Sequence, residues 1–341
     1  MARHSYGRAR ASRTQLTKAW KAIFWGLIFF GITSYAIITS SDSILQWLAQ
    51  KGNEDDEDDG QAGVGNRTWA DLQERRVERM RRGCETLGLE QTMSKIVMKH
   101  LLVDLTHNVL FCYVPKVAST SWKRLWFLMV RAAERDEIMS LPRAYVHGPT
   151  LSTLANDKFS DDARETMLGT FKKIMFTRNP LERVVSAYRD KLETEDIESS
   201  YDFHKHIGRE VERMARGKVT GGGHDVTFKE FVEFLVTPMN GTTWTEGQRN
   251  EHWRPTVDLC APCLIQYDAI GRYENLEKEG REALEWMGAG KYANDFPPPA
   301  RNAHTSRQTA QDYLRRLPVS HRLNFYKAFL LDYLLFGYQI P

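Results

Sequence analysis

Cysteine is scarce in this chain, which holds four among its 341 residues. Only Cys260 and Cys263 have C-x-x-C spacing, and a zinc site built from such pairs needs a second pair. The absence of that second pair argues against zinc, and we predict no metal site. Cys112 lies within an apolar run, where it is predicted to be a free thiol in the core.

Glycine is absent between Val109 and Gly148, although the pattern there predicts a strand that leads into a helix. A Walker A loop at such a junction would need the sequence G-x-x-x-x-G-K-[ST]. The missing motif removes the main support for an ATPase or a nucleotide kinase.

Charge is absent from Ala22–Ser41, a stretch rich in Ile, Phe, Trp and Leu. Twenty helical residues span about 30 Å, which is one hydrocarbon core. The 21 residues before this stretch contain six Lys or Arg and no Asp or Glu, so the positive-inside rule keeps the N-terminus in the cytosol. We therefore predict a cytosolic tail at 1–21 and a transmembrane signal anchor at 22–41. A cleavable signal peptide is the alternative, but Ser40-Ser41 makes a poor cleavage site.

The segment that follows is unsuited to a packed core. Glu54–Asp59 is six consecutive acids, and such a segment cannot bury enough apolar surface to fold. We predict a lumenal stem at 42–83, ending in a mixed-charge helix near 69–82, and one α/β domain at 84–341. Asn66 and Asn240 begin N-glycosylation sequons, which this topology would expose to modification.

Two short segments carry most of the chemical information. The first reads VLFCYVPKVASTSWK (Val109–Lys123), and the second reads KIMFTRNPLERVVSAYRDK (Lys173–Lys191). Each is predicted to be a buried strand that runs through a polar turn into a helix. Together they predict a two-part site for a nucleotide with phosphate-type groups at both ends.

In the first segment, the apolar run Val109–Val114 is typical of a parallel strand buried on both faces. Pro115 cannot donate to a strand ladder, so the strand should end there. Thr120 or Ser119 is predicted to cap the helix that follows. The backbone N–H groups of this loop and helix would face an anion, and Lys116 would add a full positive charge.

In the second segment, Ile174–Thr177 is predicted to be a short strand that ends at Arg178. Pro180 suits the first turn of the helix that follows. The guanidinium of Arg178 and the hydroxyl of Ser186 are placed to bind a phosphate. Arg183 is predicted to be a surface charge.

The two segments resemble the sulfotransferases that use 3′-phosphoadenylyl sulfate (PAPS). In that superfamily a P-K-x-x-x-[ST]-[ST]-x loop holds the 5′-phosphosulfate, and an R-[DE]-P-x-x-R-x-x-S-x-[FY] segment holds the 3′-phosphate. The matching stretches here are PKVASTSW and RNPLERVVSAY. By this resemblance the cosubstrate PAPS is bound by Pro115, Lys116, Val117, Ala118, Ser119, Thr120, Ser121, Arg178, Asn179, Pro180 and Ser186.

The chain is most similar to the Golgi carbohydrate sulfotransferases of the HNK-1 and chondroitin 4-O-sulfotransferase family. Further blocks in family order are DVTFKEFVEFL, HWRP, LCAPCLIQYDAIGRYENL, ARNAHTS and FLLDYLLFGY, so the similarity runs from about Leu101 to the C-terminus. Ser119 replaces the family's usual cysteine, Ser121 replaces an asparagine, and Asn179 replaces an acidic residue beside the 3′-phosphate site. The resemblance implies a P-loop-like fold with a central parallel sheet flanked by helices.

The same resemblance implies a structural disulfide, without redox chemistry, at Cys260 and Cys263. Cys84 could pair elsewhere, and the connectivity stays open at this point.

Sulfuryl transfer needs a base for the acceptor hydroxyl and a positive charge for the leaving phosphate. Lys116 can supply the charge. His252 in the HWRP block is the predicted general base, because histidine is the commonest base near neutral pH; His304 and Glu251 are the alternatives.

The family resemblance predicts a type II Golgi membrane enzyme whose partners are a glycan acceptor and the Golgi membrane, with no nucleic acid. The predicted acceptor is the 4-hydroxyl of N-acetylgalactosamine in chondroitin or dermatan. The 3-hydroxyl of terminal glucuronic acid is the alternative acceptor, and a non-catalytic lumenal glycan-binding protein is the alternative function.

Overall fold

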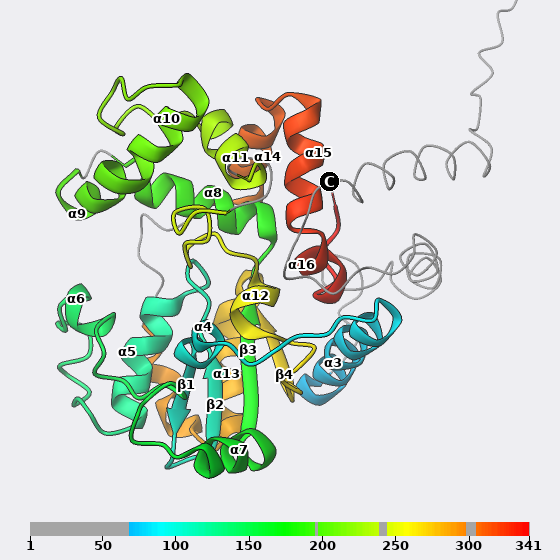
Figure 1. The fold of residues 1–341 in the computed structure, drawn as a ribbon. Helices are drawn as coiled ribbons and strands as arrows, with labels where there is room; N and C mark the ends of the chain where they lie inside the picture. The colour runs from blue at the N-terminus through cyan, green and yellow to red at the C-terminus, as the bar shows by residue number, and fades with distance from the viewer. Residues whose placement is uncertain (1–67, 195–196, 239–243, 298–304, 341) are drawn as a thin grey trace, which may run out of the picture.

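The structure, a computed structural model, describes residues 68–340 except 195–196, 239–243 and 298–304 (Figure 1). The predicted tail and anchor, most of the stem, the sequon residues Asn66 and Asn240, and His304 lie outside these residues. Within the described part, no helix is both long and apolar enough to cross a membrane.

A four-stranded sheet forms the centre of the fold, in the order β1 (Leu101–Asp104), β2 (Val109–Cys112), β3 (Lys172–Thr177) and β4 (Ala269–Arg272). Strands β2, β3 and β4 are parallel, as the sequence predicts. Strand β1 is antiparallel to β2, so an antiparallel edge strand is added to the predicted parallel sheet. The connection after Asp104 is too short for the crossover that a parallel pair would need.

One face of the sheet packs on α5 (Ser119–Met129). The ring centroids of Phe111 on β2 and Trp122 on α5 are 4.9 Å apart, and the same indole lies 4.9 Å from Phe176 on β3. On β4, a Cβ at Gly271 would lie 2.4 Å from the Phe176 ring. Only glycine therefore lets this aromatic cluster close over the sheet.

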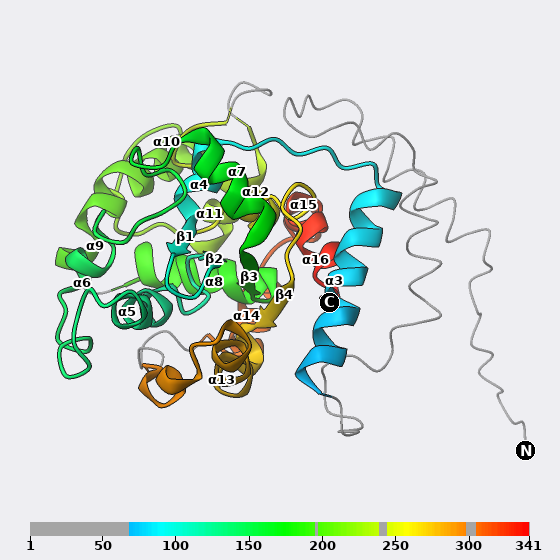
Figure 2. The same cartoon turned by 90° about the horizontal axis from the view of Figure 1, so that it is seen from below.

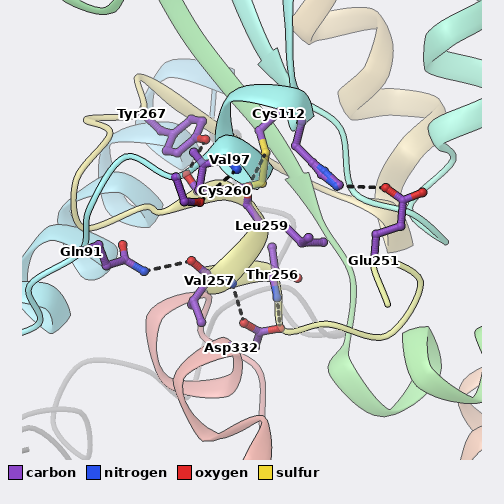
Figure 3. Close-up of a disulfide and its surroundings, with 12 residues drawn as sticks. Gln91, Val97, Cys112, Glu251, Thr256, Val257, Leu259, Cys260, Tyr267 and Asp332 are labelled. Carbon is purple, nitrogen blue, oxygen red and sulfur yellow. Dashed lines mark hydrogen bonds and ion pairs between the residues drawn. A yellow bond between two sulfur atoms is a disulfide. The ribbon is translucent and has the colours of Figure 1, made fainter. Parts of the chain in front are cut away.

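The opposite face carries a disulfide (Figure 3). Cys112 of β2 pairs with Cys260 at the end of α12 (Thr256–Cys260). The prediction of a free thiol at Cys112 was wrong, because the buried strand brings its sulfur against a helix 148 residues away in sequence. Cys263 pairs with Cys84, so the two C-x-x-C cysteines form separate structural disulfides.

Helix α3 (Trp69–Thr86) begins with a capping box at Thr68 and packs beside β4 and α16 (Leu330–Leu335), as Figure 2 shows. Its Arg76 is 3% exposed and forms a 2.7 Å ion pair with Glu279. The predicted boundary between stem and domain at 83/84 falls inside this helix, so the helix is an integral part of the packed structure.

Helices follow each parallel strand. Strand β3, preceded by α7 (Asp161–Thr170), leads into α8 (Pro180–Lys191), and β4 leads through a 3₁₀ turn, η2 (Tyr273–Asn275), into α13 (Leu276–Met287). The remaining elements are α4 (Lys95–His100), α6 (Arg143–Val146), α9 (Ile197–Asp202), the π-helix η1 (Phe203–Gly208), α10 (Arg209–Arg216), α11 (Phe228–Val236), η3 (Gly290–Asp295), α14 (Arg307–Arg315) and α15 (Val319–Ala328).

A helical layer lies beyond the carboxyl ends of the parallel strands, formed by α8 to α11, α14 and α15 (Figure 1). Ligands of open α/β sheets bind at this end, where the loops after the strands gather. Both sequence segments singled out above turn here, one after β2 and the other after β3. The fold thus brings their polar turns to one edge of the sheet.

Candidate active site

The first turn has an unusual backbone. Lys116 has φ +69° and Ala118 has φ +53°, two of the five non-glycine residues with left-handed φ in the described part of the chain. Such a conformation costs about 1–3 kcal/mol for a residue with a Cβ and concentrates at functional sites. Helix α5 begins directly after this turn, so the backbone N–H groups of its first turn lie next to the loop.

The N-cap of α5 is Ala118, which has no side-chain acceptor. The prediction that Ser119 or Thr120 caps the helix was wrong, because both lie inside its first turn. The Thr120 hydroxyl instead lies 3.0 Å from Nε2 of His147. The first-turn N–H groups of α5 are therefore left for an acceptor from outside the helix, which is the arrangement of an anion site.

Lys116 points its ammonium at a carboxylate. Its Nζ lies 3.1 Å from Oδ2 of Asp190, and its side chain is 11% exposed. Burial lowers the pKa of Lys116 to about 8, while the charge of Asp190 opposes that shift. The lysine is therefore mostly protonated at neutral pH and close to its titration range.

Arg178, directly after β3, connects the two segments. It is 3% exposed, its Nη1 donates to the carbonyl of Lys116 at 3.1 Å, and its Nη2 donates to the carbonyl of Thr305 at 2.7 Å. The guanidinium also lies over the ring of Tyr273, 4.1 Å from its centroid. Its buried Nε makes no hydrogen bond within the described part of the chain, which leaves a donor that a phosphate oxygen could use.

The remaining predicted residues of the second segment begin α8. Asn179 is the N-cap, and its side chain accepts from the N–H groups of Leu181 and Glu182. Pro180 occupies the first helical turn, as predicted. Ser186 is buried two turns along the helix. Asn179 thus caps α8. The sequence analysis had considered it only as a replacement for the family's acidic residue.

Arg183 was wrongly predicted to be a surface charge, because it is completely buried. Its guanidinium donates to three carbonyls, those of Pro115 at 3.0 Å, Arg254 at 2.6 Å and Glu251 at 3.0 Å. It therefore ties the first loop to the block that contains His252. The available signal was its spacing, since Arg183 lies three residues before Ser186 and shares its helix face.

His252 is partly buried and held by its neighbour Asn250. The Asn250 Oδ1 accepts from the backbone N–H of His252 at 3.1 Å and lies 2.9 Å from its Nδ1. Because that oxygen can only accept, Nδ1 carries the proton and Nε2 keeps its lone pair. Burial, then the charges of Lys191 and Lys116, lowers the pKa of His252 well below its usual value, so the ring is neutral and can take a proton.

The alternative base Glu251 faces another histidine. Its Oε2 lies 3.1 Å from Nε2 of His100, whose pKa burial lowers to about 3. His100 is thus neutral, and its contact with Glu251 is not an ion pair (Figure 3 labels Glu251). Glu251 therefore has a neutral hydrogen-bonding partner, although its charge also acts on Lys123, Arg183 and Lys191.

Another carboxyl near Arg178 titrates in the neutral range. Burial, then the nearby charge of Glu274, raises the pKa of Glu182 to about 7, although Arg178 opposes the shift. Its Oε2 lies 3.9 Å from Arg178 Nε. An anion bound at Arg178 would favour the protonated form of Glu182.

Three charged residues beside Lys116 were missed by sequence reasoning: Asp190, Lys191 and Arg143. Asp190 lies four residues after Ser186, a spacing that places it on the same helix face. Arg143 begins α6, far from both segments in sequence, and nothing in the local pattern indicates its position. The site thus combines an anion-binding turn, several cations and a neutral histidine.

Comparisons with known proteins agree with this chemistry. The family described as "Sulfotransferase family" matches residues 99–339. Mouse carbohydrate sulfotransferase 11 is 36% identical over 249 residues, covering 72% of this chain and 68% of the relative. Mouse carbohydrate sulfotransferase 12 is 31% identical over 264 residues, covering 72% and 61%, and human carbohydrate sulfotransferase 14 is 32% identical over 252 residues, covering 72% and 62%.

No solved structure gives a significant match. The family match covers more than half of the chain and includes both loops of the site. The chain therefore belongs to the sulfotransferase family and is a carbohydrate sulfotransferase.

Proposed function

We propose that this protein transfers the sulfuryl group of PAPS to the 4-hydroxyl of N-acetylgalactosamine in chondroitin or dermatan. The observation that carries the proposal is the hydrogen bond from Arg178 to the Lys116 carbonyl, which joins the two predicted nucleotide-binding segments at one sheet edge. Membership of the sulfotransferase family supports PAPS as the donor.

The donor would be held at both ends. The turn at Lys116–Ala118 and the start of α5 suit the 5′-phosphosulfate, because backbone N–H groups and a lysine stabilise such an anion. Arg178 and the hydroxyl of Ser186 suit the 3′-phosphate. PAPS supplies the activated sulfuryl group, and no metal is needed for this chemistry.

The chain's residues then divide the work of transfer. His252 Nε2 takes the proton of the acceptor hydroxyl as its oxygen bonds to sulfur. The bond between sulfur and the phosphate oxygen breaks, and its electron pair goes to that oxygen. Lys116 stabilises the negative charge that develops there. Arg183 positions both halves, because it binds the backbone of the first loop and of the His252 block.

The acceptor assignment is supported by charge. Lys191 and the half-exposed Arg143 lie with Lys116 around one carboxylate, so cations outnumber acids at this point of the site. A repeating uronic acid polymer such as chondroitin presents carboxylates to such a group. Names of the relatives specify carbohydrate as acceptor class.

We also propose a type II Golgi membrane location with a lumenal catalytic domain. The two disulfides support it, because disulfides persist in the secretory pathway and are rare in the cytosol. The uncharged stretch at 22–41 after a basic N-terminus supports the orientation.

The test is to incubate the full-length protein in detergent with radiolabelled PAPS and desulfated chondroitin, dermatan and glycans ending in glucuronic acid. Digestion of the labelled product should place sulfate on the 4-hydroxyl of N-acetylgalactosamine. Label on the 3-hydroxyl of terminal glucuronic acid would replace this acceptor with the alternative. Glycan binding without transfer to any acceptor would favour a non-catalytic role.

A further inference from the structure

Asp190 occupies an unusual position in the site. Its Oδ2 lies 3.1 Å from Nζ of Lys116, 3.2 Å from Nζ of Lys191 and 3.6 Å from Nη2 of Arg143. These cations come from the turn after β2, from α8 and from α6. One carboxylate oxygen therefore faces three positive charges at the meeting point of three elements.

Helix stability does not explain an acid here. Asp190 lies in the last turn of α8, where the helix dipole disfavours negative charge by about 0.3–1 kcal/mol. The Asp190 side chain is 30% exposed, so packing does not require an acid here either. The three neighbouring cations therefore explain why a negatively charged residue occupies this position.

The cluster also connects the catalytic lysine to the predicted base. Lys191 Nζ lies over the ring of Phe203, 4.6 Å from its centroid. The same ring packs edge-on against His252, with centroids 5.2 Å apart. On the α9 side, the Ser200 hydroxyl donates to the backbone carbonyl of Asp190 at 3.2 Å, which fixes the helix end that carries the carboxylate.

We propose that Asp190 is a positioning residue for sulfuryl transfer: its carboxylate holds the Lys116 ammonium in the nucleotide-free protein and gives it up to the donor's phosphate oxygen. The inference rests on the proposed function of Lys116. Donor binding then exchanges one anionic partner of Lys116 for another. Lys191 and Arg143 stay with Asp190 and keep its charge balanced.

The charges that face Lys116 determine what loss of this carboxylate does. Asp190 alone among them favours the protonated lysine, whereas Lys191 and Arg143 oppose it and burial opposes it most. Asp190→Asn should therefore lower the pKa of Lys116 below its present value of about 8. It should also leave three cations for the nucleotide without a competing carboxylate.

The first measurement is kcat/KM for PAPS against pH, with full-length protein in detergent, because this ratio reports the free enzyme. Asp190→Asn should move the fall of activity at high pH by about one pH unit to lower pH. Asp190→Glu keeps the negative charge, so its activity should fall at the same high pH as that of the wild type. Asp136→Asn, an exposed loop acid, is the matched control.

The second measurement is binding of the product 3′-phosphoadenosine 5′-phosphate by calorimetry. At pH 6.5, where Lys116 is protonated in both proteins, Asp190→Asn should bind it about threefold or more tightly than wild type, and at pH 8.5 the gain should disappear. Asp190→Ser repeats the test with a smaller side chain should the asparagine variant fold poorly.

Two results would overturn the inference and leave Asp190 with a structural role. One is a folded Asp190→Asn enzyme whose kcat/KM falls at the same high pH as that of the wild type. The other is weaker binding of the product by this variant at pH 6.5. Failure of the proposed function looks different. In that case Lys116→Ala would keep its activity, whatever Asp190 does.

Discussion

Arg178 shows how one side chain can serve both architecture and binding. Its two terminal nitrogens are used by the carbonyls of Lys116 and Thr305, and its plane covers Tyr273. Only Nε is left without a hydrogen bond among the described residues. Lys116 differs, because its ion pair with Asp190 can be exchanged for a ligand.

We expect Lys116→Ala to abolish transfer and leave the fold intact, because its side chain contacts one partly exposed carboxylate. Arg178→Ala should abolish transfer and also lower stability, since the part-buried carbonyl of Lys116 and the buried carbonyl of Thr305 lose a charged donor, at about 1–3 kcal/mol each. Ser186→Ala should have a smaller effect, because a neutral hydroxyl binds phosphate more weakly than a cation.

Steady-state kinetics and urea unfolding of the purified variants separate these effects. Lys99→Ala, an exposed lysine on α4, is the control. Near-normal activity in both the Lys116 and Arg178 variants would refute the nucleotide site.

His252→Ala should lower kcat by about 10²–10⁴, the usual contribution of a general base. Binding of 3′-phosphoadenosine 5′-phosphate should barely change, because His252 belongs to the acceptor side. The wild-type rate should fall only at pH values well below 6.5, since the folded pKa of His252 is depressed and the ring must be neutral to act. The variant should lose that acidic limb.

The pH profile of kcat/KM measures this limb, because the ratio reports the free enzyme; His224→Ala at an exposed position is the control. A folded His252→Ala enzyme with full turnover would exclude the histidine from the mechanism and favour Glu251 or His304.

At the scale of elements, α8 organises the site. Its start carries the Asn179 cap, and one face presents Arg183, Ser186 and Asp190 at spacings of three and four residues. Through these residues the helix contacts the turn after β2 twice, at Pro115 and at Lys116. A single helix therefore sets the distance between the nucleotide loop and the acceptor side.

Arg183→Met should lower the free energy of unfolding by about 3 kcal/mol or more, because it leaves one buried and two part-buried carbonyls without their charged donor. Arg281→Ala, which removes an exposed ion pair with Glu277, should change stability by less than about 1 kcal/mol. Urea denaturation of both variants checks the difference. Equal stability would mean that water replaces the guanidinium at these carbonyls.

At the scale of the whole molecule, the two disulfides hold distant parts of the chain together. Cys112–Cys260 links the sheet to α12, and Cys84–Cys263 links α3 to the segment after α12. Each bond closes a long loop, and removal of such a bond costs about 2–5 kcal/mol. Two structural disulfides of this kind are typical of proteins in an oxidising compartment.

We expect protease treatment of intact microsomes to remove only the first ~20 residues, which the proposed topology leaves in the cytosol. Endoglycosidase digestion should raise electrophoretic mobility through the loss of sugars at Asn66 or Asn240. Detergent should then expose the whole chain to protease, as the internal control. Digestion of the C-terminal domain in sealed microsomes would reverse the orientation.

Local patterns were sufficient for much of the fold and for part of the site. The run from Val109 predicted β2, and Pro180 predicted the start of α8. Each depends on residues a few positions apart, whose apolar spacing and backbone limits operate without the rest of the chain. The same reasoning placed Lys116 and Arg178 at turns that follow neighbouring strands.

Only the tertiary structure decided which residues pair in disulfides, hydrogen bonds and ion pairs. Cys112 finds Cys260, Arg183 finds the carbonyls of Pro115, Glu251 and Arg254, and Asp190 finds Lys116. None of these contacts lies within one turn or one strand, so periodicity carries no information about them. Burial of Arg183 is stable only because three separate carbonyls converge on it. The sequence by itself determined which elements form and where the polar turns lie, while packing of distant segments determined which charges meet.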